Sequence, residues 1–136
     1  MSKSVFLKSF MEEVWNQKQI DKVPDYLSES YTIHLDPGDP YEGKTLDHQA
    51  FIQRLQLSFG PFPDIHFNIL ESIEEESHVA IRWELTGTNL GPIGQLPPTK
   101  RKIKVPGMTI YHFEKGLICG HTQIFDRGKV QQQLGF

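Results

Sequence analysis

Apolar residues in the first part of the chain recur at the spacing of an α-helix. From Ser4 to about Gln19 they lie three and four residues apart, at Val5, Phe6, Leu7, Phe10, Met11, Val14 and Trp15. This period predicts a helix with one buried face. A second, short helix is predicted after Asp21, whose side chain can cap it, with Pro24 in its first turn.

A third helix is predicted near the middle of the chain. Thr45 can cap it, Gly60 ends it, and its apolar face carries Phe51, Leu55 and Phe59. Before this helix, residues 31–35 alternate between apolar and polar as a strand does, and residues 36–40 have the Asp, Pro and Gly content of a turn. Helices therefore dominate the first half of the chain.

After Gly60 the period changes from about 3.6 to two, which is the period of a β-strand. The alternating apolar residues are Ile65, Phe67, Ile69, Val79, Ile81, Trp83 and Leu85. Two further strands, residues 102–113 and 117–125, form a predicted hairpin with a three-residue loop, and Pro106-Gly107 predicts a bulge that bends the first of them. Residues 87–99 are rich in Gly and Pro and predict a long loop at the mouth of the sheet.

Helices first and antiparallel strands afterwards define an α+β fold. We expect one domain over residues 1–136, in which a curved antiparallel sheet wraps around the N-terminal helices. In such an arrangement one face of each strand is available to line a cavity. The pattern therefore predicts a pocket between the helices and the sheet.

Composition narrows the classes of partner and the compartment. The net charge of -3 gives no basic surface for a polyanion, so we expect no nucleic-acid partner. No run of about 20 apolar residues is present, so we expect no membrane insertion. The single cysteine, Cys119, excludes an intramolecular disulfide, and acidic residues interrupt the N-terminal apolar pattern that a signal peptide would continue. A cytoplasmic protein is predicted.

The spacing of the potential metal ligands favours neither a metal nor a nucleotide. No two histidines stand four residues apart on a predicted helix, and no cluster of Asp, Glu and His has ligand spacing. The glycine-rich segment 87–99 lacks the Lys-Ser/Thr pair and the strand-to-helix context of a phosphate-binding loop. We therefore expect no metal and no cofactor.

Several motifs resemble those of one family. The run Arg82-Trp83 with Gly87-Thr88, Gly91, Gly94 and Pro97-Pro98-Thr99 is similar to the signature of SnoaL-like polyketide cyclases. The segment YHFEKG at 111–116, Asp126 and the ending QQQLG at 131–135 resemble the last hairpin, the catalytic aspartate and the C-terminal motif of that family. The resemblance implies the cone-shaped fold of the nuclear-transport-factor-like superfamily, which is a cystatin-like α+β barrel. It also implies acid-base catalysis of an intramolecular aldol ring closure, with Asp126 as the catalytic residue.

An aldol closure needs a base beside a carbonyl, a group that stabilises the enolate, and an acid that protonates the product. One carboxyl group, that of Asp126, can shuttle the proton. An apolar wall would disfavour its ionised form, and the residues we expect in that wall are Trp83, Met108, Ile110 and Ile124. The alternative interpretation of Asp126 is a cap of the short C-terminal helix that includes Val130 and Leu134.

Histidines are the candidate partners of Asp126. His34 is the preferred one, as donor to a substrate carbonyl or as orienting group, and its alternative is an exposed strand histidine. The resemblance recommends His112 as a substrate contact, whereas parity places His121 on the opposite face from Asp126, at the surface or in an interface. The remaining predicted pocket residues are Trp15, Phe51, Leu55, Trp83, Met108 and Ile110.

The sequence thus supports two main functions. The first is a cofactor-independent aldol cyclase, lyase or isomerase acting on a small apolar carbonyl compound. The second is a non-catalytic ligand-binding or dimerisation domain. Epoxide hydrolysis is a third candidate and ranks last, because it needs a second acid beside Arg82 and Asp126 and the sequence places none there. A homodimer is expected through the sheet face opposite Asp126, which would carry Leu117, Cys119 and Phe125.

Overall fold

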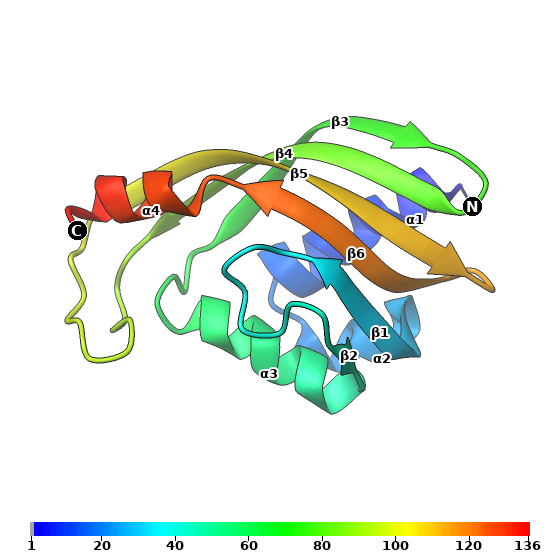
Figure 1. The fold of residues 1–136 in the computed structure, drawn as a ribbon, viewed down its shortest axis with the longest axis horizontal. Coiled ribbons are helices and arrows are strands. Elements are labelled where there is room, and N and C mark those ends of the chain that lie inside the picture. The colour runs from blue at the N-terminus through cyan, green and yellow to red at the C-terminus, as the bar shows by residue number, and fades with distance from the viewer. Residues whose placement is uncertain (1) are drawn as a thin grey trace.

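The computed structural model describes residues 2–136 and packs the helices against one side of a single curved sheet (Figure 1). In chain order the helices are α1 (Lys3–Phe10), the π-helix η1 (Met11–Asn16), the 3₁₀ helix η2 (Ile20–Lys22), α2 (Val23–Tyr26), α3 (His48–Phe59) and α4 (Arg127–Leu134). The strands are β1 (Leu27–Leu35), β2 (Thr45–Leu46), β3 (His66–Glu74), β4 (His78–Thr88), β5 (Lys102–Glu114) and β6 (Leu117–Phe125).

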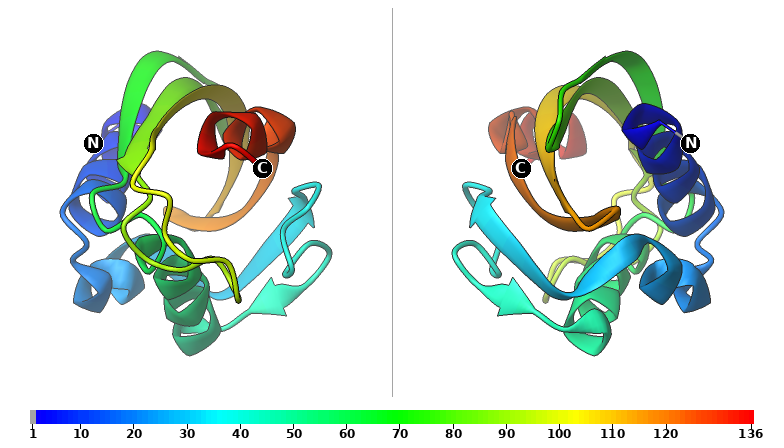
Figure 2. Two further views of the ribbon diagram at one scale, coloured as in Figure 1. Left: turned by 90° about the vertical axis from the view of Figure 1, so that its left-hand side faces the viewer. Right: turned by 90° about the vertical axis from the view of Figure 1, so that its right-hand side faces the viewer.

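The strand order is β2-β1-β6-β5-β4-β3. Neighbouring strands are antiparallel except β1 and β6, which are parallel. The predicted α+β fold is confirmed, although the sheet is an open arch rather than a closed barrel (Figure 2). The parallel pair matters for the site, because it places the end of β1 beside the second half of β6.

The starts of two helices can be compared with the predictions. Pro24 lies in the first turn of α2, as expected. The cap of α3 is Asp47, whose carboxylate accepts from the backbone N–H of Ala50 at 2.8 Å, so the prediction of Thr45 was wrong. Thr45 instead lies in β2, where it pairs with Thr32 of β1, since a β-branched residue suits a strand.

The β5–β6 hairpin differs from the prediction in its loop and in its bulge. The loop has two residues, Lys115 and Gly116, which both have positive φ (53° and 80°), as a type I′ turn requires. The bulge lies in β6, where Cys119 is the extra residue, and not at Pro106, where the β4–β5 register is regular. Each change shifts the register by one residue, which decides the face on which a side chain lies.

The hydrophobic core fills the space beneath the arch. Buried side chains of α1, η1 and α3 pack against the concave face of β4, β5 and β6, and they include Leu7, Phe10, Val14, Phe51 and Leu55. Along β5 the odd-numbered residues from 103 to 113 are buried and the even-numbered ones point outward. Trp83 pairs with Gly107, so it faces inward, whereas Met108 and Ile110 face outward. Ile124 is exposed as well, so the apolar wall predicted from Trp83, Met108, Ile110 and Ile124 is not formed.

Candidate functional site

A small cavity lies between the helices and the concave face of the sheet. Its volume is about 90 Å³, which is less than the roughly 150 Å³ of a cavity that holds benzene. Aromatic side chains form much of its wall, including Trp15, Phe51, Phe67, Trp83 and Phe125. Its polar lining comes from Tyr31, Asp39, Arg54, His121, Gln123 and Arg127, among others. The cavity thus combines an apolar surface with a compact polar cluster.

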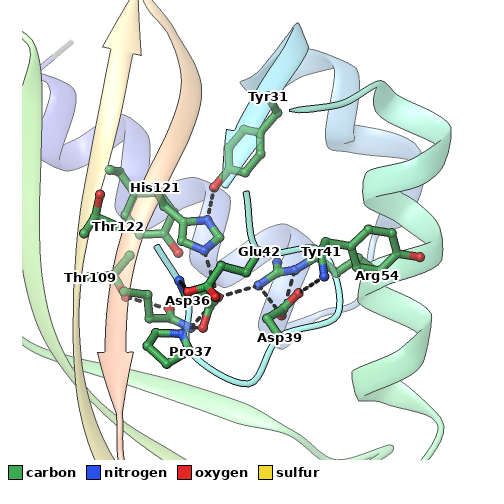
Figure 3. Close-up of polar contacts among 12 residues, drawn as sticks. Tyr31, Asp36, Pro37, Asp39, Tyr41, Glu42, Arg54, Thr109, His121 and Thr122 are labelled. Carbon is green, nitrogen blue, oxygen red and sulfur yellow. Dashed lines mark hydrogen bonds and ion pairs between the residues drawn. The ribbon is translucent and has the colours of Figure 1, made fainter. Parts of the chain in front are cut away.

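His121 occupies the centre of this cluster (Figure 3). Its side chain is almost completely buried, and both ring nitrogens have partners. Nδ1 lies 2.6 Å from the hydroxyl of Tyr31, and Nε2 lies 2.9 Å from Oδ2 of Asp36. His121 was expected at the surface or in an interface, and its burial shows that this prediction was wrong.

The carboxylate of Asp36 collects hydrogen bonds from several elements. Arg54 of α3 donates to it from Nη2 at 3.0 Å, and Arg127 of α4 also donates from Nη2 at 3.0 Å. Gln123 of β6 donates to Oδ2 at 3.2 Å. These donors satisfy a carboxylate that has no exposure to solvent, as a buried charge requires.

The surroundings set the protonation states of the cluster. Burial acts to raise the pKa of Asp36, but the hydrogen bond from His121 and the charge of Arg54 outweigh it and lower the pKa. Burial lowers the pKa of His121, and the charge of Arg54 acts in the same direction against the opposing hydrogen bond with Asp36. Burial raises the pKa of Tyr31 well above its usual value. At neutral pH the cluster therefore contains an ionised aspartate, a neutral imidazole and a neutral phenol.

These states fix the directions of the two hydrogen bonds of His121. An ionised carboxylate only accepts, so Nε2 carries the proton and donates it to Asp36. Nδ1 then has a free lone pair, which accepts from the hydroxyl of Tyr31. The imidazole thus bridges a carboxylate and a hydroxyl as the histidine of a Ser-His-Asp triad does, with its two ring nitrogens exchanged and a phenol at the position of the serine.

A second chain of hydrogen bonds approaches Asp36 from the sheet. The indole N–H of Trp83 donates to Thr109 at 2.8 Å, and the hydroxyl of Thr109 donates to Oε1 of Gln123 at 2.7 Å. The amide of Gln123 donates in turn to Asp36. Because Trp83 can only donate, the direction of the whole chain is fixed. This chain holds Gln123 with its amide N–H groups toward the carboxylate.

Backbone pairing brings these residues together. β1 and β6 run parallel, with Ile33 opposite His121 and Leu35 opposite Thr122, so Asp36 emerges beside the inward-facing residues of β6. The turn after β1 is held by the N–H of Asp36, which donates to Glu42 at 2.8 Å. α3 then presents Arg54 to the turn, where it also binds Asp39.

Asp126 lies outside the cavity. It is exposed and caps α4, where its carboxylate accepts from the backbone N–H of Lys129 at 3.0 Å. This is the geometry of the alternative interpretation of the residue. Asp126 and His34 do not lie together in the cavity, because neither belongs to its lining.

His34 and His112 meet on the convex face of the sheet. Their rings stack with centroids 4.7 Å apart, and His78 packs edge-on against His112 at the same distance. Burial, with smaller effects of His34 and His78, lowers the pKa of His112 to about 4. His112 is therefore remote from the inner cavity that the aromatic residues line.

The predicted pocket residues divide between the two faces. Trp15, Phe51 and Trp83 line the cavity, and Leu55 is buried in the core beside it. Met108 and Ile110 lie on the convex face, 59% and 43% exposed. Phe125, which was expected on an uncovered dimer face, lines the cavity instead. The bulge at Cys119 explains the exchange of faces, because strict alternation from buried Ile118 would have placed Ile124 and Asp126 inside.

Sequence reasoning missed most of the polar cluster. Its overlooked members are Tyr31, Asp36, Arg54, Gln123 and Arg127. One available signal was Asp36, the first acidic residue after an alternating strand and the start of the turn Asp-Pro-Gly-Asp-Pro. The contacts of Arg54 and Arg127 depend on tertiary structure, and no local spacing encodes them.

Residues 2–136 contain neither a metal-binding cluster nor a helix that could span a membrane. No group of three His, Cys, Asp or Glu side chains among them is arranged to hold a metal ion. None of the helices in this part of the chain has the length and apolar character that crossing a bilayer requires.

The open arch of sheet over helices, with a polar cluster in its concavity, defines a nuclear-transport-factor-like α+β protein. The sequence profile of the SnoaL-like polyketide cyclases matches residues 6–134. The chain belongs to the SnoaL-like polyketide cyclase family. No curated protein matches the sequence.

Solved structures agree with this assignment. A candidate polyketide cyclase from Acidithiobacillus ferrooxidans has 36% identity and a TM-score of 0.90, covering 98% of this chain and 97% of its own. IdmH, a candidate polyketide cyclase from Streptomyces antibioticus, has 21% identity and a TM-score of 0.82, with 98% of each chain covered. AclR from Streptomyces galilaeus, named as a candidate hydroxylase, has 19% identity and a TM-score of 0.77, covering 95% of this chain and 78% of its own. The last two likenesses concern the fold alone.

Proposed function

We propose that the protein is a cofactor-independent enzyme that enolises a small, neutral carbonyl compound in the inner cavity, as the first step of an aldol-type cyclisation or an isomerisation. The observation that carries this proposal is the pair of His121 and Tyr31. A basic nitrogen and a phenolic hydroxyl lie 2.6 Å apart, and both residues line the same cavity. Enolisation needs a base for the carbon-bound proton and a donor for the developing oxyanion, and this pair supplies one of each.

His121 is the proposed base. Its pKa is lowered by burial, so the imidazole stays unprotonated at neutral pH. When the hydroxyl of Tyr31 turns to a substrate oxygen, the lone pair of Nδ1 becomes free to take a proton from the adjacent carbon. Asp36 remains hydrogen-bonded to Nε2 and stabilises the imidazolium that forms, as the aspartate of a catalytic triad does.

Tyr31 is the proposed oxyanion donor. Its pKa is raised well above the usual value because the side chain is buried, so the phenol keeps its proton and can donate a hydrogen bond. A donor fixed in a site without water stabilises developing negative charge more than it would in solution. After the carbon–carbon bond forms or the double bond moves, the proton on His121 returns to the product.

The charge balance of the cavity favours a neutral substrate. Asp36 and Asp39 are matched by Arg54 and Arg127, which bind them at 3.0–3.8 Å. With His121 neutral, no uncompensated charge remains in this group to hold an anion or a cation. The aromatic walls then favour an apolar body around the carbonyl group.

The test is hydrogen–deuterium exchange at the carbon beside a carbonyl. Acetone and butanone, which have fewer heavy atoms than benzene and so suit the small cavity, are incubated with the protein in D₂O, and the loss of their α-proton signals is followed by NMR. We expect exchange faster than in buffer. His121→Gln should slow it by about 100-fold or more, the usual scale of general base catalysis. Tyr31→Phe, which removes only the hydroxyl, should also slow it.

His112→Gln is the matched control, because it changes a histidine on the convex face and should leave the exchange rate unchanged. Far-ultraviolet circular dichroism shows whether each variant is folded. A folded His121→Gln protein that exchanges as fast as the wild type would contradict the proposal. Equal loss of activity in His112→Gln would also contradict it.

A further inference from the structure

The side-chain amide of Gln123 has one more donor than the polar cluster uses. Its Nε2 carries two N–H groups, and within residues 2–136 it binds Asp36 alone, at 3.2 Å from Oδ2 and 3.4 Å from Oδ1. Seen from Nε2, the two oxygens of one carboxylate lie in nearly the same direction, whereas the two N–H bonds of an amide diverge widely. One N–H therefore points at Asp36, and the other points away from it.

The orientation of this amide is fixed at its other end. Oε1 accepts from the hydroxyl of Thr109 at 2.7 Å, and Thr109 accepts from the indole N–H of Trp83 at 2.8 Å. Because the indole can only donate, the oxygen and nitrogen of the amide cannot exchange places. Thr109 and Trp83 are both buried, so water does not compete for these bonds. The second N–H is therefore held in one position, as a preorganised donor must be.

Gln123 lies beside the proposed base. His121 and Gln123 are two residues apart on β6, so their side chains share one face of the strand, and both line the inner cavity. Both also donate to Oδ2 of Asp36, His121 at 2.9 Å and Gln123 at 3.2 Å, which holds them side by side. Tyr31 binds the other ring nitrogen, Nδ1. The imidazole thus has a phenol next to Nδ1 and an amide next to the partner of Nε2.

A second oxygen on the substrate would find a donor in this arrangement. When Tyr31 binds the carbonyl oxygen, the second N–H of Gln123 is free to bind an oxygen on a neighbouring carbon. An N–H group without an acceptor in a shielded site costs free energy, so a ligand that supplies an acceptor gains affinity. The acceptor should be uncharged, because the carboxylates of Asp36 and Asp39 are already matched by two arginines.

We propose that Gln123 binds a second, uncharged oxygen of the substrate, so that the site prefers an α-hydroxy carbonyl compound to a plain ketone. The inference rests on the proposed function, because it assigns the first oxygen to Tyr31. It adds a substrate class to that function and gives Gln123 a role in specificity, through the N–H that does not bind Asp36.

Hydroxyacetone and butanone test this preference, because they have the same number of non-hydrogen atoms and differ in a hydroxyl in place of a methyl group. Exchange of their methylene protons in D₂O is measured and divided by the rate in buffer, which removes their difference in acidity. We expect this ratio to favour hydroxyacetone by about 3- to 10-fold, the effect of one hydrogen bond. Gln123→Met, which has a similar shape and no donor, should abolish the preference. Gln53→Met, the same change at an exposed position of α3, is the matched control and should keep it.

A second measurement needs neither a variant nor catalysis. In the ¹⁵N-labelled wild type, one proton signal of the Gln123 side-chain amide should shift further on addition of hydroxyacetone than on addition of butanone. Absence of catalysed exchange with both compounds, together with this shift, would contradict the proposed function and support binding at Gln123. Amide signals that respond equally to the two compounds would overturn the inference. So would a Gln123→Met protein that is folded by circular dichroism and keeps the wild-type preference.

Discussion

At the scale of single residues, the site depends on compensation of one buried charge. Asp36 is shielded from solvent and accepts hydrogen bonds from His121, Arg54, Gln123 and Arg127. Removing one donor from such a group leaves part of the charge unpaired, which costs more than the lost bond itself. The cluster is therefore rigid, which suits a base that must keep one tautomer and one orientation.

Asp126 provides a prediction at the same scale. Asp126→Ala removes the cap of α4 and should lower the free energy of unfolding by about 1 kcal/mol. Asp126→Asn should cost less, because asparagine is also a good N-cap. Urea denaturation measures both. Equal stability of the alanine variant and the wild type would show that the bond to Lys129 does not stabilise the helix.

The alternation of side chains along the last strand was correctly predicted, but the face of the strand that is buried was not. His121 and Asp126 do lie on opposite faces of the chain, as the alternation indicated. The register of the hairpin then decides which face is buried, and it depends on positive φ at Lys115 and on one extra residue, Cys119. Neither feature has a distinctive sequence pattern, since lysine rarely adopts that conformation.

At the scale of elements, β5 shows how a glycine serves packing. Gly107 was interpreted as part of a bulge, yet its strand is regular there. A Cβ atom at this position would lie 2.2 Å from the indole of Trp83. Gly107 therefore lets the indole lie against the backbone of β5, from where its N–H reaches Thr109.

Gly107→Ala should destabilise the fold by about 1–3 kcal/mol, because the buried indole must move to make room. Gly87→Ala in β4 is the control, since a Cβ there meets Phe62 at an ordinary 3.4 Å. Thermal unfolding compares the two variants. An equal or smaller loss of stability in Gly107→Ala would contradict the proposed packing role.

Periodic elements were predictable, and the connections between them were less so. The helix period of residues 4–19 and the alternation in β3 to β6 follow from burial of one face, which leaves a direct mark on the sequence. The parallel pairing of β1 with β6 joins segments about 90 residues apart and has no such mark. Because this pairing positions Asp36, the site could not be assembled from local patterns.

At the scale of the whole molecule, the buried cluster couples stability to pH. The pKa of His121 is lower in the folded chain than its usual value of 6.5, so unfolded chains bind more protons as the pH falls. The pKa of Asp36 is also lower in the folded chain than its usual value of 3.8. Below that pH the unfolded chain again binds more protons than the folded one. The stability from these groups is complete above pH 6.5 and is lost progressively toward acid.

We therefore expect the free energy of unfolding to fall from pH 7 to pH 5, and to fall less steeply in His121→Gln. One proton contributes at most about 1.4 kcal/mol per pH unit. His66→Gln, at an exposed position, is the control and should keep the slope of the wild type. Urea denaturation at each pH gives the slopes. Equal slopes in His121→Gln and wild type would contradict the assigned state of His121.

The family resemblance placed catalysis at Asp126, whereas the geometry of the whole molecule favours His121 inside the cavity. The most direct measurement is the rate of α-proton exchange of butanone in D₂O, compared between Asp126→Asn and His121→Gln under the same conditions. Our account predicts a wild-type rate for folded Asp126→Asn and loss of catalysis for folded His121→Gln. The reverse result, with catalysis lost only in Asp126→Asn, would contradict it.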